Sequence, residues 1–150
     1  MRNQKGQLTL LVVEDDAALR RLFTSMLDNG GFTTLAAGTA AEGLSIVRQH
    51  HGAIDLAVVD MVMPGESGLD LATDLGREFP ELKILYISGY VDSIAADVIS
   101  RRTPDRVLLK PFNQDTLLAR VHLLLETAPI IDPGQAGQTA APHVRPRISD

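Results

Sequence analysis

Residues 9–21 read TLLVVEDDAALRR, and the change in the middle of this stretch decides how the chain can fold. The apolar run of residues 8–13 ends in three consecutive acids, which are Glu14, Asp15 and Asp16. Charged groups at the edge of a core cost free energy unless something balances them. The acids therefore either begin a solvated helix or form half of a site, and the rest of the chain has to distinguish the two.

Four more short apolar runs follow the first, and helical patterns separate them. Most of these runs are almost continuously apolar, as strands covered on both faces of a parallel sheet are. Alternating strands and helices predict a parallel sheet with right-handed crossovers and helices on both faces. We expect an α/β fold, a flavodoxin-like (βα)5 doubly wound sheet with strand order 2-1-3-4-5. The predicted strands are residues 8–13, 33–37, 56–60, 83–88 and 106–110.

Apolar residues at helical spacing predict five helices, one after each strand. The fourth, over about residues 92–102, has the least regular pattern. Start and stop signals bound the others. The first ends at Gly30 and Gly31, the second covers about residues 40–50, the third runs from near Ser67 until Pro80, and the last follows Asn113.

The composition excludes several classes of protein. The chain has 150 residues, a formal charge of −5 and no cysteine. An acidic chain is poorly suited to hold nucleic acid or an anionic membrane by electrostatics, and without cysteine there are no disulfides and no thiolate chemistry. We recognise no signal peptide and no apolar stretch approaching the roughly 18 residues that cross a membrane. We therefore expect a soluble, cytoplasmic domain.

The domain organisation follows from a change in composition near residue 128. We expect an N-terminal extension at residues 1–7, one folded domain at 8–127 and a flexible tail rich in Pro and Gly at 128–150. The residues after Glu126 are too few for a helix-turn-helix unit, so we expect no DNA-binding domain. Output should then run through contact with another protein.

Acidic residues gather at one edge of the predicted sheet, because the carboxyl ends of parallel strands meet there. Glu14 and Asp15 follow the first strand, and Asp60 ends the third. The strand order makes these strands neighbours, about 4.8 Å apart. Two carboxylates about 4 Å apart repel by roughly 4 kcal/mol at an effective dielectric of 20, so the site needs positive charge. Carboxylates without His or Cys nearby favour Mg²⁺.

Two more polar groups belong to the same edge. Ser88 ends the fourth strand and Lys110 ends the fifth, which adds a hydroxyl and an ammonium group. With Mg²⁺ around one carboxylate, these groups suit a phosphoryl group bonded to that carboxylate. Asp60 is central and is the predicted nucleophile. The loop after it can present the backbone carbonyl of Val62 to the metal, whereas Asp16 more simply begins the following helix.

Four motifs occur in order at the predicted strand ends: VVEDD at 12–16, DMVMPGESGLD at 60–70, ISGY at 87–90 and LLKPF at 108–112. With these motifs the chain resembles the receiver domain of two-component response regulators, over about residues 7–127. Each motif alone is weak, but the four together are specific. The forms SGY and KPF are most similar to receivers that stand alone or are attached to hybrid sensor kinases.

The resemblance implies a signalling phosphoprotein that catalyses only its own phosphorylation and slow dephosphorylation. The phosphoryl donor would be a sensor histidine kinase or a histidine phosphotransfer protein. A downstream protein would bind the face formed by the fourth helix, fifth strand and fifth helix. The implied site has Asp60 as phosphoacceptor, Ser88 and Lys110 against the phosphate, Glu14 and Asp15 on Mg²⁺, and a cis peptide bond between Lys110 and Pro111.

The chain departs from the receiver pattern at one position. Receivers usually carry Tyr or Phe three residues before the strand-5 lysine, where this chain has Val107. We predict that Tyr90 takes over part of the coupling between phosphorylation and conformation. Val62 and Tyr90 also flank the approach of an attacking water, which predicts slow self-hydrolysis.

Two other functions compete with the receiver interpretation. A haloacid-dehalogenase-like phosphohydrolase needs an Asp two residues after the nucleophile, and Val62 at that position argues against it. A pseudo-receiver, which is an interaction module that works without phosphorylation, stays open because the usual aromatic residue is missing at Val107.

Overall fold

A computed structural model describes residues 7–51, 53–63, 66–89 and 104–127. Five parallel strands form one sheet in the order β2-β1-β3-β6-β7, which confirms the predicted 2-1-3-4-5 arrangement and the flavodoxin-like α/β fold. These strands are β1 (Thr9–Val13), β2 (Thr33–Ala37), β3 (Leu56–Asp60), β6 (Lys83–Ser88) and β7 (Val107–Leu109).

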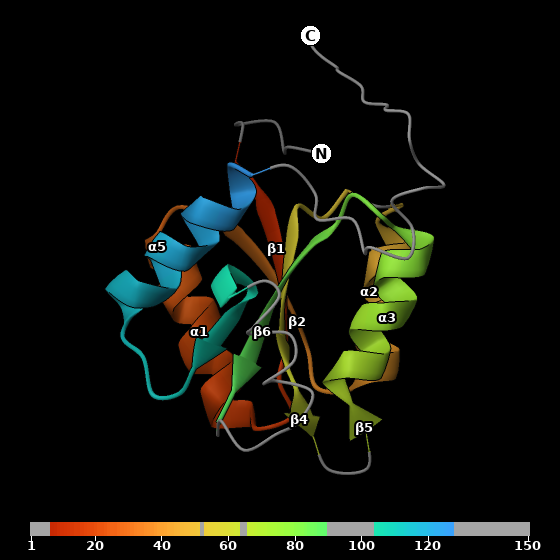
Figure 1. Cartoon of the computed structure of the whole chain (residues 1–150), viewed down its shortest axis with the longest axis horizontal. Helices are drawn as coiled ribbons and strands as arrows, with labels where there is room; N and C mark the ends of the chain where they lie inside the picture. The colour runs from red at the N-terminus through yellow and green to blue at the C-terminus, as the bar shows by residue number, and fades with distance from the viewer. Residues whose placement is uncertain (1–6, 52, 64–65, 90–103, 128–150) are drawn as a thin grey trace, which may run out of the picture.

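Helices cover both faces of this sheet (Figure 1). Helices α1 and α5 lie on one face, and α2 and α3 lie on the other. A short 3-10 helix, η1 (Pro104–Arg106), leads into β7. The bounds are α1 (Ala17–Asn29), α2 (Ala40–Gln49), α3 (Gly68–Glu78) and α5 (Gln114–Leu125).

Side-chain caps begin the helices close to where the sequence predicts them. Oδ1 of Asp16 accepts a hydrogen bond from the Leu19 N–H at 3.0 Å, so Asp16 is the N-cap of α1 as predicted. Asn113 caps α5 in the same way, with Oδ1 2.8 Å from the Thr116 nitrogen. Each cap satisfies an N–H group that the helix itself leaves unpaired.

The core lies in two layers, one on each side of the sheet. Every residue of β3 is buried, as expected for a central strand covered on both faces. Alternate residues of the strands point to opposite layers. In β1, Leu10 and Val12 pack with α1 and α5, whereas Leu11 and Val13 pack with α2 and α3.

Some predicted segments lie outside the described residues. These are the helix over residues 92–102, the tail at 128–150 and, apart from Gln7, the N-terminal extension. Among the helices that the structure describes, none has both the length and the apolar character needed to cross a membrane.

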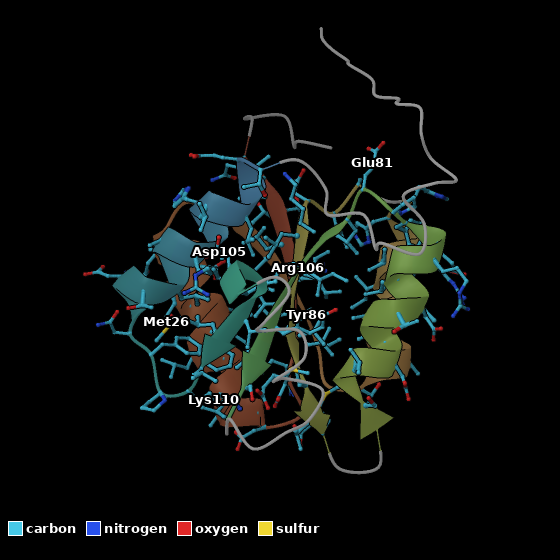
Figure 2. All side chains as sticks on the ribbon, in the orientation of Figure 1. Met26, Glu81, Tyr86, Asp105, Arg106 and Lys110 are labelled. Atoms are coloured by element: carbon cyan, nitrogen blue, oxygen red, sulfur yellow. The ribbon has the colours of Figure 1, made fainter. Side chains whose placement is uncertain are left out.

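The segment after Asp60 contains a small antiparallel pair that the sequence did not predict. Strand β4 (Val62–Met63) pairs with β5 (Glu66–Ser67), where only a loop was expected. Two residues are too few to show a periodic pattern, so no local signal marks these strands. The pair lies at the carboxyl edge of the sheet (Figure 1). In Figure 2, Lys110 lies at this edge and Glu81 at the opposite one.

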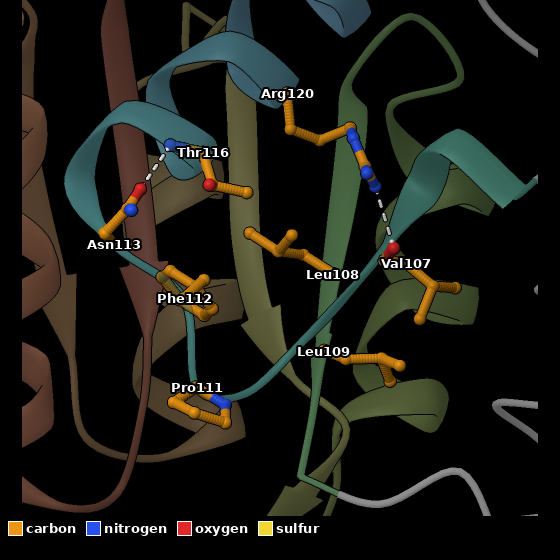
Figure 3. A pocket seen from close by; sticks show the side chains of 8 residues that line it. All are labelled: Val107, Leu108, Leu109, Pro111, Phe112, Asn113, Thr116 and Arg120. Atoms are coloured by element: carbon orange, nitrogen blue, oxygen red, sulfur yellow. Dashed lines mark hydrogen bonds between the residues drawn. The ribbon is translucent and has the colours of Figure 1, made fainter.

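A hollow of about 580 Å³ lies beside β7 and the start of α5 (Figure 3). The Arg120 side chain lies at one end, where its Nη1 donates to the carbonyl oxygen of Val107 at 2.8 Å. Strand β7 and helix α5 are two of the three elements of the predicted output face. The lining residues are Val107, Leu108, Leu109, Pro111, Phe112, Asn113, Thr116 and Arg120.

Candidate functional site

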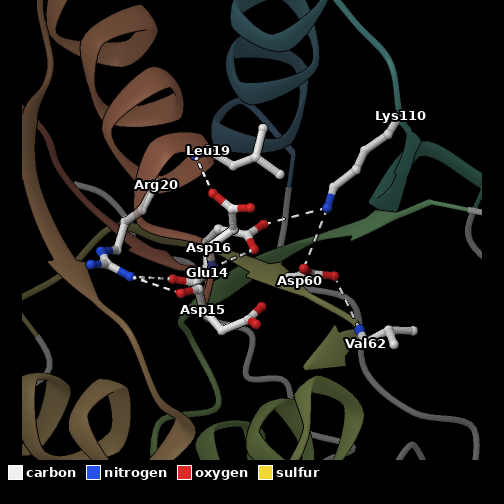
Figure 4. A network of polar contacts seen from close by, with 8 residues as sticks. All are labelled: Glu14, Asp15, Asp16, Leu19, Arg20, Asp60, Val62 and Lys110. Carbon is white, nitrogen blue, oxygen red and sulfur yellow. Dashed lines mark hydrogen bonds and ion pairs between the residues drawn. The ribbon is translucent and has the colours of Figure 1, made fainter. Parts of the chain in front are cut away.

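The pairing of β1 with β3 brings the predicted acids together at the carboxyl edge. Val13 is the register partner of Val59, so Glu14, which directly follows β1, lies beside Asp60, the last residue of β3. Glu14, Asp15 and Asp60 each contribute one carboxylate oxygen to a cluster, and these three oxygens lie within 4.8 Å of one another (Figure 4). Three carboxylates at this spacing provide the hard oxygen donors that Mg²⁺ prefers, and the exposure of Asp15 leaves room for water ligands. The residues present therefore fit this cation.

Lys110 brings a positive charge to the same point. Its Nζ lies 3.4 Å from Oδ2 of Asp60 and 3.5 Å from Oε1 of Glu14. The peptide bond from Lys110 to Pro111 is cis, as the resemblance implied. The Lys110 N–H donates to the carbonyl oxygen of Ser88 at 2.8 Å, which ties the end of β7 to the end of β6.

Glu14 is almost completely buried, with 2% of its surface exposed. The pKa of its carboxyl is raised from 4.5 to about 7, chiefly by burial and further by the nearby Asp60 carboxylate. The Asp16 N–H, which donates to Oε2 of Glu14 at 3.1 Å, and the Lys110 ammonium oppose this increase in the pKa. A bound divalent cation would favour the ionised form of Glu14.

Asp60 is also buried, at 4% exposure, and the chain after it turns back over its backbone. Oδ1 of Asp60 accepts a hydrogen bond from the Val62 N–H at 3.0 Å, while the Val62 side chain is 65% exposed. Gly68 begins α3 directly against the end of β3, where a Cβ atom would collide with the carbonyl oxygen of Asp60. Only glycine permits this approach.

Ser88 is buried at the end of β6, one residue beyond Ile87, the register partner of Asp60. The predicted site residues Glu14, Asp15, Asp60, Ser88 and Lys110 thus share the carboxyl edge. The amide of Val62 contacts Asp60, and the predicted role of the Val62 carbonyl as a metal ligand stays a prediction.

Sequence reasoning missed one residue that contacts this cluster. Nη1 of Arg20 donates to the carbonyl oxygen of Glu14 at 2.8 Å and lies 3.4 Å from that of Asp15 (Figure 4). An arginine on the polar face of an amphipathic helix is ordinary, so the sequence carries no signal for this contact. The sequence also placed Gly68 only near the start of a helix and gave no sign of its close approach to the Asp60 backbone.

The position of the missing aromatic residue is occupied by Val107, which is buried. Its register partner on β6 is Tyr86, and both belong to the core layer beneath α2 and α3. The Arg106 guanidinium carbon lies 5.5 Å from the centre of the Tyr86 ring (Figure 2). Tyr90, the residue predicted to couple phosphorylation to conformation, lies outside the described residues.

Comparisons with known proteins agree with this geometry. The family model of the response regulator receiver domain matches residues 10–122. The two-component response regulator PhoP of Pseudomonas aeruginosa is 36% identical over 121 residues, which cover 79% of this chain and 52% of that protein. The sensor kinase CckA of Brucella abortus is 32% identical over 121 residues, which cover 81% of this chain but 13% of the kinase. This chain thus spans about half, or much less, of the length of these relatives.

Solved structures show the same fold. A CheY-like response regulator receiver domain protein from Methanospirillum hungatei JF-1 superposes with a TM-score of 0.70 at 27% sequence identity. The match covers 80% of this chain and 94% of the other. The family model, the relatives and the fold lead to one conclusion: the chain belongs to the response regulator receiver domain family.

Proposed function

We propose that Asp60 accepts a phosphoryl group from the phosphohistidine of a sensor histidine kinase or a histidine phosphotransfer protein. The observation that carries this proposal is the convergence of three carboxylates within 4.8 Å, with the Lys110 ammonium 3.4 Å from Asp60. A carboxylate oxygen of Asp60 attacks phosphorus and a P–O bond forms. The P–N bond to the imidazole breaks, and the nitrogen keeps the electron pair and takes up a proton.

The neighbouring residues divide the supporting roles. Glu14, Asp15 and Asp60, with the carbonyl of Val62, would hold Mg²⁺, which neutralises the charge of the phosphoryl oxygens when it is bound. Lys110 exchanges its pairing with the two carboxylates for a phosphoryl oxygen, and the Ser88 hydroxyl donates to another. We expect the catalysis to be limited to phosphorylation of the domain itself and slow hydrolysis of the phosphorylated Asp60.

The proposal extends to the organisation and the partners of the domain. We place the folded unit at residues 8–127, close to the 10–122 matched by the family model, and expect it to work in the cytoplasm. Output would pass to a protein that binds the face containing β7 and α5. The hollow of Figure 3 lies on this face and gives a downstream protein a recess to fill.

The test is exposure of the 150-residue chain to acetyl phosphate, with and without Mg²⁺, read by intact mass. Wild type should gain one phosphoryl group only with Mg²⁺, and Asp60→Asn should gain none. Asp115→Asn, the same substitution at an exposed acid in the first turn of α5, should behave as wild type. Wild type that gains no phosphoryl group would contradict the proposal and favour the pseudo-receiver, the alternative suggested by Val107.

A further inference from the structure

The turn between β1 and α1 carries two of the three clustered acids, and one arginine side chain spans it (Figure 4). The two carbonyl groups that Nη1 of Arg20 contacts belong to Glu14 and Asp15, at 2.8 and 3.4 Å. One of these carbonyls lies in the peptide before the Cα of Asp15 and the other in the peptide after it. A single guanidinium nitrogen therefore holds both peptide planes that decide where the Asp15 side chain points.

Glu14 is held by other groups as well. Its N–H donates to the carbonyl oxygen of Ala37 at 3.1 Å, and its Oε2 accepts from the Asp16 N–H at 3.1 Å. The Asp15 side chain is exposed. Among the described residues, the hydrogen bond that holds the Asp15 residue is made by its backbone carbonyl, which accepts from Arg20. Asp15 consequently depends on Arg20 more than Glu14 does.

A third segment, the turn that contains Gly38, provides the space that the Arg20 guanidinium occupies. A Cβ atom at Gly38, in the turn between β2 and α2, would lie 3.0 Å from Nη1 of Arg20, closer than ordinary van der Waals contact. The Gly38 N–H donates to Oε1 of Glu42 at 2.8 Å, which keeps this turn against the start of α2. The position of Arg20 is therefore defined by two turns, not by its own helix alone.

We propose that Arg20 is a positioning residue for the divalent cation, because it aims the Asp15 carboxylate at Glu14 and Asp60. The inference rests on the proposed Mg²⁺ site. The direction in which Mg²⁺ affinity changes when Arg20 is removed distinguishes positioning from a simple effect of charge. A guanidinium group near three carboxylates disfavours a cation through space, so charge alone predicts that removing Arg20 tightens Mg²⁺ binding. Positioning predicts that removing it weakens binding.

The experiment is a titration of the ¹⁵N-labelled 150-residue chain with MgCl₂, in which amide shifts of Asp15, Asp16 and Val62 give the dissociation constant. We expect Arg20→Gln to bind Mg²⁺ about tenfold more weakly, the lower end of the loss seen when groups that support metal ligands are removed. Arg20→Lys should recover part of the affinity, because one ammonium nitrogen can donate to the same two carbonyls.

The matched control is Arg21→Gln, which removes the same charge from the next, exposed position of α1 and should keep the wild-type affinity. A thermal midpoint close to that of wild type should accompany the weaker binding of Arg20→Gln. In the metal-free variant, hydrogen exchange at the amides of Asp15 and Asp16 should be faster. If Arg20→Gln is too unstable to titrate, Arg20→Met, which keeps the aliphatic packing, is judged by the same criterion.

Two results would overturn the inference, and only one of them would also contradict the proposed Mg²⁺ site. Equal or tighter binding by Arg20→Gln removes the role of Arg20 and leaves the proposed function intact. A wild-type chain that shows no saturable Mg²⁺ binding removes the metal site itself and the role of Arg20 with it.

Discussion

The ammonium of Lys110 lies 3.4 Å from Oδ2 of Asp60, although 50 residues separate them in the chain. The same Nζ lies 3.5 Å from Oε1 of Glu14, so one cation serves two carboxylates. Both carboxylates are buried, so the loss of this cation would leave them poorly compensated. The ion pairing of Lys110 and the burial of Glu14 lead to the first two predictions, which concern substitutions at these two residues.

Replacing Lys110 with Met should lower the free energy of unfolding by about 1 to 3 kcal/mol near neutral pH without metal, because it leaves two buried carboxylates without their cation. The more negative site should bind Mg²⁺ more tightly. MgCl₂ should therefore stabilise Lys110→Met more than it stabilises wild type in urea unfolding.

Lys83→Met is the matched control for this comparison. Its Nζ donates to the carbonyl oxygen of Leu125 at 2.8 Å, at the other end of β6. The loss of this bond should cost stability, but MgCl₂ should stabilise the variant only as much as wild type. An equal effect of MgCl₂ on both variants would contradict the proposed role of Lys110.

Glu14→Gln should stabilise the metal-free protein above neutral pH. The pKa of Glu14 is raised from 4.5 to about 7 by burial and by Asp60, so between these values the native state binds a proton that the unfolded chain has released. Wild-type stability therefore falls as pH rises through this window. The variant lacks the effect and should exceed wild type on the order of 2 kcal/mol at about pH 8, with little difference near pH 4 to 5.

Urea unfolding at several pH values measures this difference. Glu78→Gln provides a control of opposite sign, because the hydrogen bond from Arg48 lowers the pKa of this exposed glutamate. Its removal should slightly destabilise the protein above neutral pH. A difference between Glu14→Gln and wild type that does not change with pH would show that the buried carboxyl does not titrate in this window.

Gly68→Ala and Gly76→Ala should have opposite effects, although both lie in α3. A Cβ at Gly68 collides with the Asp60 carbonyl, so we expect a loss of about 2 kcal/mol or more of stability and shifted amide resonances around Asp60. At Gly76 a Cβ meets no atom within 4 Å in the described structure, so alanine should stabilise the helix by roughly 0.5 to 1 kcal/mol. Chemical unfolding and ¹⁵N spectra test both, and equal effects would refute the close approach at Gly68.

Val62→Asn should shorten the lifetime of phosphorylated Asp60 several-fold. The Val62 side chain is 65% exposed beside Asp60, the proposed phosphoacceptor, and a polar side chain there can orient an attacking water. The backbone N–H that donates to Asp60 is unchanged, so stability should stay within about 0.5 kcal/mol. Intact mass after removal of acetyl phosphate gives the lifetime. Leu123→Asn, at an exposed apolar residue of α5, is the control, and equal lifetimes would rule out shielding by Val62.

Most of the framework could be predicted from the sequence, because its signals are local. Apolar runs such as residues 56–60 identify strands, and the side chains of Asp16 and Asn113 bond to amides three residues away, so caps are readable without a fold. Of the two strand orders common in such sheets, the one favoured for five strands then places Glu14 beside Asp60.

Tertiary structure alone decided the contacts that complete the site, because they depend on distances between segments that no local pattern relates. Arg20 is a plain helix residue until the turn at Gly38 leaves room for its guanidinium over the β1–α1 turn. Gly68 is an ordinary helix-start glycine until α3 packs against the Asp60 backbone. The sequence determined that Glu14 is an acid at a strand end. Burial under the folded sheet edge determined that its pKa lies near neutrality.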